Sequence, residues 1–336
     1  PVFLMTLKTA KLATLSFFLT FFIASCDRAV IVDPFLPPDL DPRTFTHLDL
    51  GNPTSADENP ANTDNFLLKK STFAISYNNT LRHANWVSWE TNATYLGNAA
   101  RTDDFAPDNS LPTGFVKVLP TEFFTTGFDR GHVLPSADRT FNSAENRETF
   151  LMTNMIPQAP LLNRESWNNL EQYCRDLVRS GYNIYVVAGA YGTGGDGTNG
   201  AATTVGNGVN VPARNYKIIV ATKQTSVSMI TRDAIVIATD FPNSNDITNN
   251  RDWVRFITTP EEIEKDAKVS FFTGVSTTLR NDFRKRLFNI DDAQIKVETS
   301  CKKFDNRTLY VGTEGGCYYF TNGGNKSYVD RSLCDC

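Results

Sequence analysis

The sequence has few histidines, few cysteines outside its last 36 residues, and no large excess of charge of either sign. Of its 336 residues, three are histidine and six are cysteine, and the formal net charge is -4. A net charge this small gives no overall attraction to a polyanion. A polyanionic partner would therefore have to be held by a local cluster of Arg and Lys. The length fits one large domain, or one domain with appendages.

The chain also lacks an apolar run near its N-terminus that is long enough for a comfortable transmembrane helix. The run from Leu12 to Ile23 is shorter than the ~20 apolar residues that such a helix needs. Two lysines precede it and the sequence Ile-Ala-Ser-Cys26 ends it, a pattern typical of a signal peptide. Because this ending resembles a bacterial lipobox, we expect residues 1–26 to be a signal peptide and Cys26 to be lipidated.

Residues 27–46 contain four prolines among acidic residues. This composition cannot bury a core and is typical of a semi-rigid tether. A lipid on Cys26 followed by a tether predicts an extracytoplasmic, membrane-anchored lipoprotein, in the periplasm or on the cell surface. The alternative is a plain secretory signal, which predicts a secreted protein.

From His47 onward the pattern is that of a globular domain. Between the fourth and fifth of the strands that we expect, Gly-, Thr- and Asn-rich residues 192–210 predict a long surface loop. The predicted strands and helices together indicate a mostly antiparallel sheet flanked by a few helices, so the predicted fold class is α+β. Apolar runs and alternation predict the strands at residues 72–77, 85–89, 114–119, 183–189, 216–221 and 234–238.

One predicted helix runs from about residue 163 to residue 180. Its apolar side chains, Trp167, Leu170, Cys174 and Leu177, fall at helical spacing, so Cys174 is interpreted as a buried thiol. Gly181 is placed as its C-terminal cap. A second helix is expected to start at residue 259, where Thr-Pro-Glu-Glu supplies an N-cap and a proline at the first position.

His132 lies in the densest run of chemically special residues, Asp129-Arg130-Gly131-His132. An imidazole takes a proton near neutral pH and a guanidinium holds phosphate. Gly131 lets the backbone turn tightly, so that neighbouring side chains can converge. A positioned general base contributes ~10²–10⁴-fold to a rate. A buried structural histidine is the alternative, but the flanking Asp and Arg favour a catalytic base.

Asn163 and Glu171 are the candidate metal-binding residues. On a straight helix, residues eight apart lie ~80° apart around the axis and ~12 Å apart along it, so both cannot ligate one ion directly. Magnesium accepts few protein ligands and keeps several waters. We therefore expect Asn163 to bind the ion directly and Glu171 to reach it through water. A solvated polar helix face is the alternative that the residues alone leave open.

Three motifs in this order resemble the DNA/RNA non-specific endonucleases. They are Asp129-Arg-Gly-His132, the sequence Phe-Leu-Met-Thr-Asn-Met-Ile-Pro-Gln at 150–158, and Asn163-x3-Trp167-x2-Leu170-Glu171. The resemblance covers roughly residues 47–278 and is closest to the sugar-non-specific nuclease A type. It implies a ββα-metal (His-Me finger) nuclease fold, which we assign to residues 47–288.

The resemblance also implies an activity, a cofactor and site roles. Such enzymes cleave DNA and RNA endonucleolytically to 5′-phosphorylated products, with Mg²⁺ as the expected ion and Mn²⁺ possible. Little sequence preference is implied, since such a site reads backbone and not base edges. Arg175 has an alternative role as the helix-surface partner of Glu171. The implied roles are general base for His132, metal ligand for Asn163, water-mediated metal contact and catalysis for Glu171, phosphate binding and catalysis for Arg101 and Arg130, and substrate binding for Asn154 and Arg175.

Residues 289–336 are interpreted as a linker and a small Cys-rich module, which resembles the short basic adaptor modules of assorted microbial and viral proteins. Its cysteines are Cys301, Cys317, Cys334 and Cys336. A Cys-dense tail suggests disulfides in an oxidising compartment, with three possible pairings. Zinc binding is the alternative, although no Cys-x2-Cys pair is present.

The sequence therefore predicts a magnesium-dependent, membrane-tethered nuclease that acts on DNA and RNA. Two other functions stay open: a catalytically inactive nucleic-acid-binding lipoprotein, and a surface-interaction protein in which the tail is the active part. The intact set of His132, Asn163 and Glu171 argues against the inactive form. The sequence does not identify an inhibitor protein.

Overall fold

The computed structural model describes residues 46–245 and 253–290, together with residues 304, 309–311, 317–320 and 326–333. The expected signal peptide, the lipidated Cys26 and the tether up to residue 45 lie outside the described residues. Within the described parts of the chain, no helix is both long enough and apolar enough to cross a membrane.

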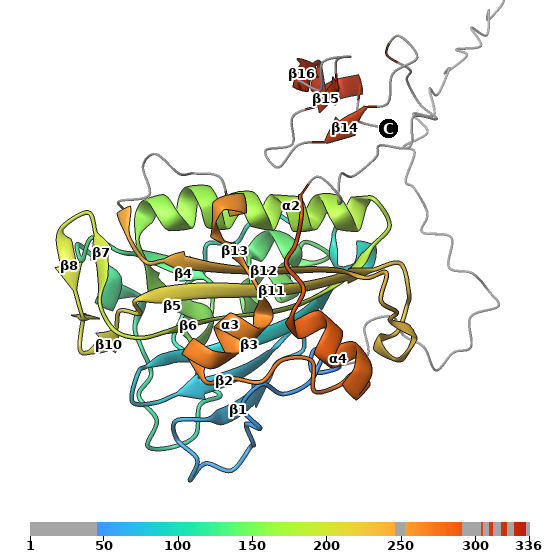
Figure 1. Cartoon of the computed structure of the whole chain (residues 1–336). Helices are drawn as coiled ribbons and strands as arrows, with labels where there is room; N and C mark the ends of the chain where they lie inside the picture. The colour runs from blue at the N-terminus through green and yellow to red at the C-terminus, as the bar shows by residue number, and fades with distance from the viewer. Residues whose placement is uncertain are drawn as a thin grey trace, which may run out of the picture. The chain divides into compact units, whose positions relative to one another are not determined.

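A seven-stranded sheet forms the centre of the domain (Figure 1). Its strand order is β1-β2-β3-β6-β11-β12-β13, and every neighbouring pair is antiparallel. The middle strands β6 and β11 are buried on both faces, which explains their continuous apolar runs. The strands are β1 Phe66–Lys69, β2 Ala74–Asn78, β3 His83–Thr91, β6 Asn183–Tyr191, β11 Arg214–Thr222, β12 Ile235–Pro242 and β13 Ile257–Thr258.

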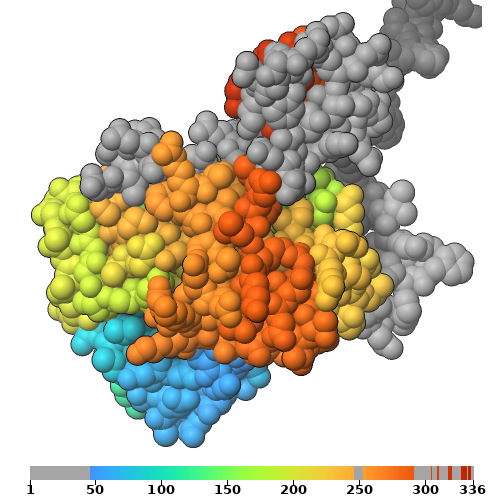
Figure 2. Space-filling model, in the orientation of Figure 1, coloured from blue at the N-terminus to red at the C-terminus, as the bar shows by residue number. Residues whose placement is uncertain are grey.

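Helices cover both faces of this sheet. Helix α2 (Asn168–Arg179) lies along one face, and α3 (Pro260–Ala267) and α4 (Thr277–Arg284) lie on the other (Figure 1). The sheet has a hydrophobic core on each face, and successive residues of β11 point into opposite cores. Ile219 packs in the core under α2, and Ile218 packs in the core under α3 and α4. In Figure 2 the side chains of α3 and α4 (orange) form a continuous surface over their face.

A two-stranded ribbon and the helix that follows it make a ββα unit beside the sheet. Strands β4 (Asp129–His132) and β5 (Met155–Gln158) pair with Gly131 opposite Ile156. A Cβ atom on Gly131 would lie only 2.1 Å from the Oε1 atom of Gln158, so any larger residue here would displace the buried side chain of Gln158.

Short elements connect these parts. In the C-terminal segment, taken by itself, three short strands form a separate antiparallel sheet. The connecting elements are η1 Ala93–Tyr95, η2 Pro120–Phe123, η3 Ser136–Asp138, α1 Ser143–Glu148, η4 Met152–Asn154, β7 Gly195–Gly197, β8 Gly200–Ala202, β9 Thr204–Val205, β10 Val209–Asn210, η6 Val227–Met229 and η8 Trp253–Phe256, and those of the C-terminal segment are β14 Tyr310–Val311, β15 Cys317–Phe320, β16 Lys326–Val329 and η9 Arg331–Leu333.

The α+β class and the antiparallel sheet are confirmed, but two of the local predictions are wrong. Residues 114–119 form no strand, because side chains take the hydrogen bonds that a neighbouring strand would: the amide of Val116 donates to Asn79 Oδ1, and its carbonyl accepts from Tyr77 Oη. Residues 192–210 are not a plain loop, because they fold into two short ribbons, β7–β8 and β9–β10.

The predicted central helix is also interrupted. A π-helical turn, Leu162–Trp167, precedes α2, so the regular helix begins at Asn168. Gly181 follows α2 with φ +84°, as expected of a C-terminal cap. The predicted start of α3 is confirmed, with Thr259 as N-cap in a capping box.

Cys317 in β15 is disulfide-bonded. The pairing among the tail cysteines stays a prediction, because Cys301, Cys334 and Cys336 lie outside the described residues. Cys174 is a buried free thiol whose pKa burial raises to about 12, which makes it unreactive at neutral pH.

Candidate active site

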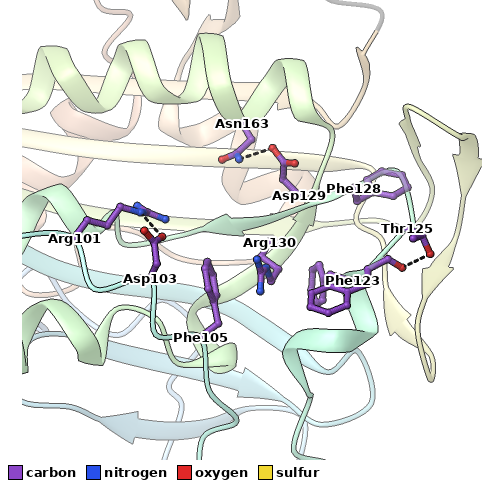
Figure 3. Close-up of a pocket in the computed structure, with 10 residues that line it drawn as sticks. Arg101, Asp103, Phe105, Phe123, Thr125, Phe128, Asp129, Arg130 and Asn163 are labelled. Atoms are coloured by element: carbon purple, nitrogen blue, oxygen red, sulfur yellow. Dashed lines mark hydrogen bonds and ion pairs between the residues drawn. The ribbon is translucent and has the colours of Figure 1, made fainter.

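A pocket of about 410 Å³ lies where β4 meets the first turn of the central helix (Figure 3). Three separate stretches of the chain form it: the segment around Arg101, the turn and strand that end in Arg130, and Asn163 from the π-helical turn. Its lining residues are Arg101, Asp103, Phe105, Phe123, Phe124, Thr125, Phe128, Asp129, Arg130 and Asn163.

Asn163 is held in one orientation by a carboxylate of β4. Its Nδ2 donates to Asp129 Oδ2 at 2.9 Å, and Arg164 donates to both oxygens of the same carboxylate. The amide nitrogen is therefore committed to Asp129 and the amide oxygen, Oδ1, points the other way (Figure 3). An amide oxygen fixed in this way is preorganised to bind a hard cation.

The π-helical turn bears directly on this site, because it contains Asn163. Turns of this kind occur frequently at functional sites. Because the π-helical turn interrupts the helix, the predicted separation of Asn163 and Glu171 on a straight α-helix is wrong for this chain. The same turn ends at Trp167, whose Nε1 donates to the carbonyl oxygen of His132 at 3.2 Å and so joins the helix to β4.

His132 ends β4 in a half-buried position between two aromatic rings. Its imidazole meets the rings of Phe105 and Phe150 edge-on, with centroids 5.6 Å and 4.8 Å away. Burial lowers its pKa to about 3, and the positive charges of Arg101 and Arg130 add to this effect. His132 is therefore neutral at physiological pH, the form that can accept a proton. Its Nε2 atom is buried and meets no hydrogen-bond partner in the described part of the chain.

Arg101 and Arg130 bring positive charge to the pocket. Arg101 bonds Asp103 Oδ1 through Nε and Ser136 Oγ through Nη1, each at 2.7 Å. The guanidinium of Arg130 lies 3.8 Å from the centroid of the Phe105 ring, a cation–π contact. The structure thus brings these two predicted arginines into one pocket with Asn163.

Glu171 and Arg175 do not line this pocket. Glu171 is 8% exposed, and its Oε1 lies 3.2 Å from the buried ammonium of Lys217 on β11. Burial raises the pKa of Glu171, whereas the positive charges of Lys217 and Arg175 act to lower it. Arg175 donates to Asp138 Oδ1 at 3.0 Å in the interior, so its alternative role as a helix-surface partner of Glu171 is wrong.

Asn154 has a supporting role and no opening for substrate. It is fully buried, its Oδ1 accepts from the amide of Leu134, and its Nδ2 donates to the carbonyls of Leu134 and Thr149. Both amide hydrogens of Asn154 are donated to backbone carbonyls, so the predicted contact with substrate is wrong. Asn154 instead fixes the backbone just after His132.

The sequence interpretation missed three features of the site. The motif presents Asp129 as a companion of His132 and gives no sign that Asp129 orients Asn163. Lys217 gave no signal, because it lies in an apolar run 46 residues after Glu171. The aromatic wall of the pocket was also missed, although the closely spaced Phe123, Phe124 and Phe128 before the motif were a visible signal.

Comparison with known proteins bears on the family and the fold of this chain. The family model for DNA/RNA non-specific endonucleases matches residues 50–278. A nuclease of Nostoc sp. is 40% identical over 258 residues, which cover 76% of this chain and 91% of that protein. The human mitochondrial nuclease EXOG is 30% identical over 249 residues, covering 71% of this chain and 63% of that protein.

A solved structure shares the fold. The crystal structure of the EndoG/EndoGI complex, which concerns the mechanism of EndoG inhibition, matches with a TM-score of 0.57 and 26% identity, covering 69% of this chain and 91% of the matched chain. This match confirms the expected ββα-metal nuclease fold. Together with the family match and the Nostoc relative, it shows that the chain belongs to the DNA/RNA non-specific endonuclease family and is a nuclease that hydrolyses nucleic acids.

Proposed function

We propose that this chain is a magnesium-dependent endonuclease that hydrolyses phosphodiester bonds of both DNA and RNA to 5′-phosphorylated products. The observation that carries the proposal is the fixed orientation of Asn163. Its amide nitrogen is bound by Asp129, and its oxygen is presented to a pocket that two arginines line. His132, adjoining this pocket through Phe105, supplies the base.

The donor set suits magnesium. Among the described residues, no group of three or more His, Cys, Asp or Glu side chains could hold a metal ion together. A softer metal usually takes such a set, whereas Mg²⁺ binds through one or two oxygen ligands and keeps its waters, as Mn²⁺ also can. Asn163 Oδ1 would bind the ion. Glu171 does not line the pocket, so it would reach the ion only through bound water, and through Oε2, since Oε1 faces Lys217. Bound there, the ion would neutralise charge on the phosphate and on the leaving oxygen.

The protein groups divide the remaining chemistry. Neutral His132 accepts the proton of the attacking water, and the negative phosphodiester raises the pKa of the imidazole toward the working pH as it binds. Arg101 and Arg130 hold the phosphate oxygens through charge-assisted hydrogen bonds. None of these groups reads a base edge, so we expect little sequence preference.

Two further expectations concern partners and location. The solved EndoG complex with EndoGI makes a protein inhibitor a candidate partner for this chain. The lipobox resemblance supports a lipoprotein anchored through Cys26 outside the cytoplasm. Metabolic labelling with a tagged fatty acid tests this, because a Cys26→Ala variant should lose the label, and equal labelling of both proteins would reject the anchor.

Plasmid nicking tests the activity. The wild type should relax and then degrade supercoiled DNA in Mg²⁺, and should lose this activity in EDTA. His132→Ala should be slower by ~10²–10⁴-fold, the contribution of a positioned base. A wild type that binds but does not cut with any divalent metal would instead support the inactive nucleic-acid-binding alternative.

A further inference from the structure

The exposed ring of Phe124 is a feature of the pocket that the proposed hydrolysis does not use. Phe124 lines the pocket and is 57% exposed, which is unusual for a phenylalanine in this domain. The guanidinium of Arg130 lies 5.6 Å from the centroid of its ring. An apolar ring therefore stands open to solvent next to a group that we expect to hold phosphate.

The other aromatic side chains of the pocket are already occupied. Phe123 and Phe128 are 4% and 5% exposed and pack into an apolar cluster with Val205, Val209 and neighbouring residues. The ring of Phe105 is covered by the guanidinium of Arg130 at 3.8 Å. Among the aromatic residues of the pocket, Phe124 is the one that is more than half exposed.

The turn that carries Phe124 is held rigidly. Thr125 has φ +58°, a left-handed conformation that costs free energy in a non-glycine residue and persists only where its surroundings impose it. Here the β7–β8 ribbon imposes it: Asn199 Nδ2 donates to the carbonyl of Thr125, and the amide of Thr198 donates to the carbonyl of Gly127. A backbone turn fixed before the ligand arrives loses less conformational entropy on binding than a flexible loop would.

We propose that Phe124 is a stacking platform for one unstacked base of the substrate, beside the phosphate that Arg130 holds. The proposal rests on the proposed nuclease function and names the form of nucleic acid that the site takes. Every base has a flat face, so stacking tolerates any sequence. In a continuous duplex both faces of each base are covered by neighbours. Single-stranded or locally unstacked DNA and RNA are therefore cut in preference to regular duplex.

The test uses a single-stranded DNA oligonucleotide with one abasic tetrahydrofuran residue at its centre. Cleavage in Mg²⁺ is read bond by bond on a sequencing gel, and bonds far from the abasic residue serve as the internal standard. In the wild type, cleavage at a bond next to the abasic residue should fall about 10-fold, because the missing base cannot stack. In Phe124→Ala that local dip should disappear.

Phe124→Ala should also cut single strands about 10-fold more slowly while its rate on duplex changes little, and Phe124→Trp should retain the preference for single strands. Phe141→Ala is the matched control, because Phe141 is 48% exposed and does not line the pocket; it should behave as wild type. Thermal unfolding of each variant confirms that it is folded.

Two results would overturn the proposal. One is a wild type that cuts evenly past the abasic residue, and the other is a dip that persists in Phe124→Ala. Either would leave the nuclease function standing. A wild type that cleaves none of the intact oligonucleotide in Mg²⁺ would instead reject the proposed function, and the stacking platform with it.

Discussion

Asp129 and His132 lie three residues apart on β4, yet their side chains serve the site in different ways. His132 would act on the attacking water itself. Asp129 acts through Asn163, because its carboxylate binds the amide nitrogen and so decides which atom of Asn163 faces the pocket. Partners of this kind, one contact away from a metal, commonly matter almost as much as the ligand.

Asp129→Ala should therefore weaken metal binding by roughly 10- to 100-fold, since the amide of Asn163 would be free to rotate. Titration calorimetry with Mn²⁺ measures the affinity directly. Arg164→Ala is the control: its side chain is 66% exposed and binds the same carboxylate, so its loss should have little effect. Equal Mn²⁺ affinity in Asp129→Ala and the wild type would contradict the orienting role.

His47 gives a prediction for the dependence of stability on pH. It is buried and neutral, with Nε2 donating to the carbonyl of Ser71 and Nδ1 accepting from the amide of Glu90. Burial, aided by the charge of Arg139, lowers its pKa from 6.5 to about 3. The unfolded chain therefore binds this proton more readily, and the stabilisation by His47, fully present above pH 6.5, is lost as the pH falls from 6.5 toward 3.

The comparison that isolates this effect is urea unfolding of the wild type and His47→Asn between pH 7.5 and 4.5. Below pH 6.5 the difference in unfolding free energy between the two proteins should shrink by up to ~1.4 kcal/mol per pH unit. A difference that stays constant over this range would show that His47 is not held neutral.

Among the single residues of the site, the sequence identified those whose role is indicated by their immediate neighbours in the chain. His132 and Asn163 each lie in a motif of adjacent or closely spaced residues, so their chemistry could be inferred. The roles of Asn154 and Arg175 could not, because both depend on partners from other parts of the chain: the carbonyl of Leu134 for Asn154, and Asp138 for Arg175.

Between α2 and the sheet lies a network of buried charges. Lys217 of β11 pairs with Glu171, and its ammonium lies 4.0 Å from the centroid of the Trp167 ring. One turn later, Arg175 of α2 pairs with Asp138, which also accepts from Trp89 of β3. The network thus ties the helix to the sheet and to the segment after β4. Breaking a buried pair leaves an uncompensated charge, which is strongly destabilising.

Lys217→Met should lower the free energy of unfolding by about 3–5 kcal/mol, because Glu171 loses its partner in the interior. Lys69→Met is the matched control, since Lys69 also pairs with a glutamate, Glu58, but the two side chains are 44% and 60% exposed. Its loss should cost less than ~1 kcal/mol. Chemical denaturation measures both, and equal losses would contradict a structural role for the buried pair.

Strands and helices could be predicted from the sequence where the pattern of side chains alone determines the local structure. Strands β6 and β11 follow from their apolar runs, and the start of α3 follows from its N-cap and its first-position proline. The segment 114–119 has the alternation of a strand but no neighbouring strand to pair with, and pairing depends on the whole fold. The π-helical turn at Leu162–Trp167 gives no periodic signal of its own, so a regular helix was the natural expectation.

For the molecule as a whole, the comparisons place the nuclease at residues 50–278, and the short strands β14 to β16 lie beyond it. Deleting residues 300–336 should therefore leave plasmid nicking intact, because the pocket residues all lie before the deleted segment. A loss of turnover on free DNA in the deleted protein, with unchanged thermal unfolding, would show that the tail takes part in catalysis.

The net charge of -4 is compatible with a polyanionic substrate because phosphate can be held by direct contact with individual guanidinium groups. Arg101 and Arg130 offer such groups at the pocket, where Asp103 pairs with Arg101 and Asp129 pairs with Arg164. Cleavage at low substrate concentration should accordingly slow as salt rises, since exposed charges are screened within ~10 Å at 0.1 M salt.

In the proposed mechanism His132 supplies the base and Asn163 the metal contact of a single site. Removing the imidazole of His132 and then adding free imidazole tests the role of the base. His132→Gly should nick plasmid ~10²–10⁴-fold more slowly than the wild type, and free imidazole in the buffer should restore part of that rate in Mg²⁺. Asn163→Ala, which keeps His132, should gain nothing from imidazole. If His132→Gly cleaves as fast as the wild type without imidazole, His132 is not the base.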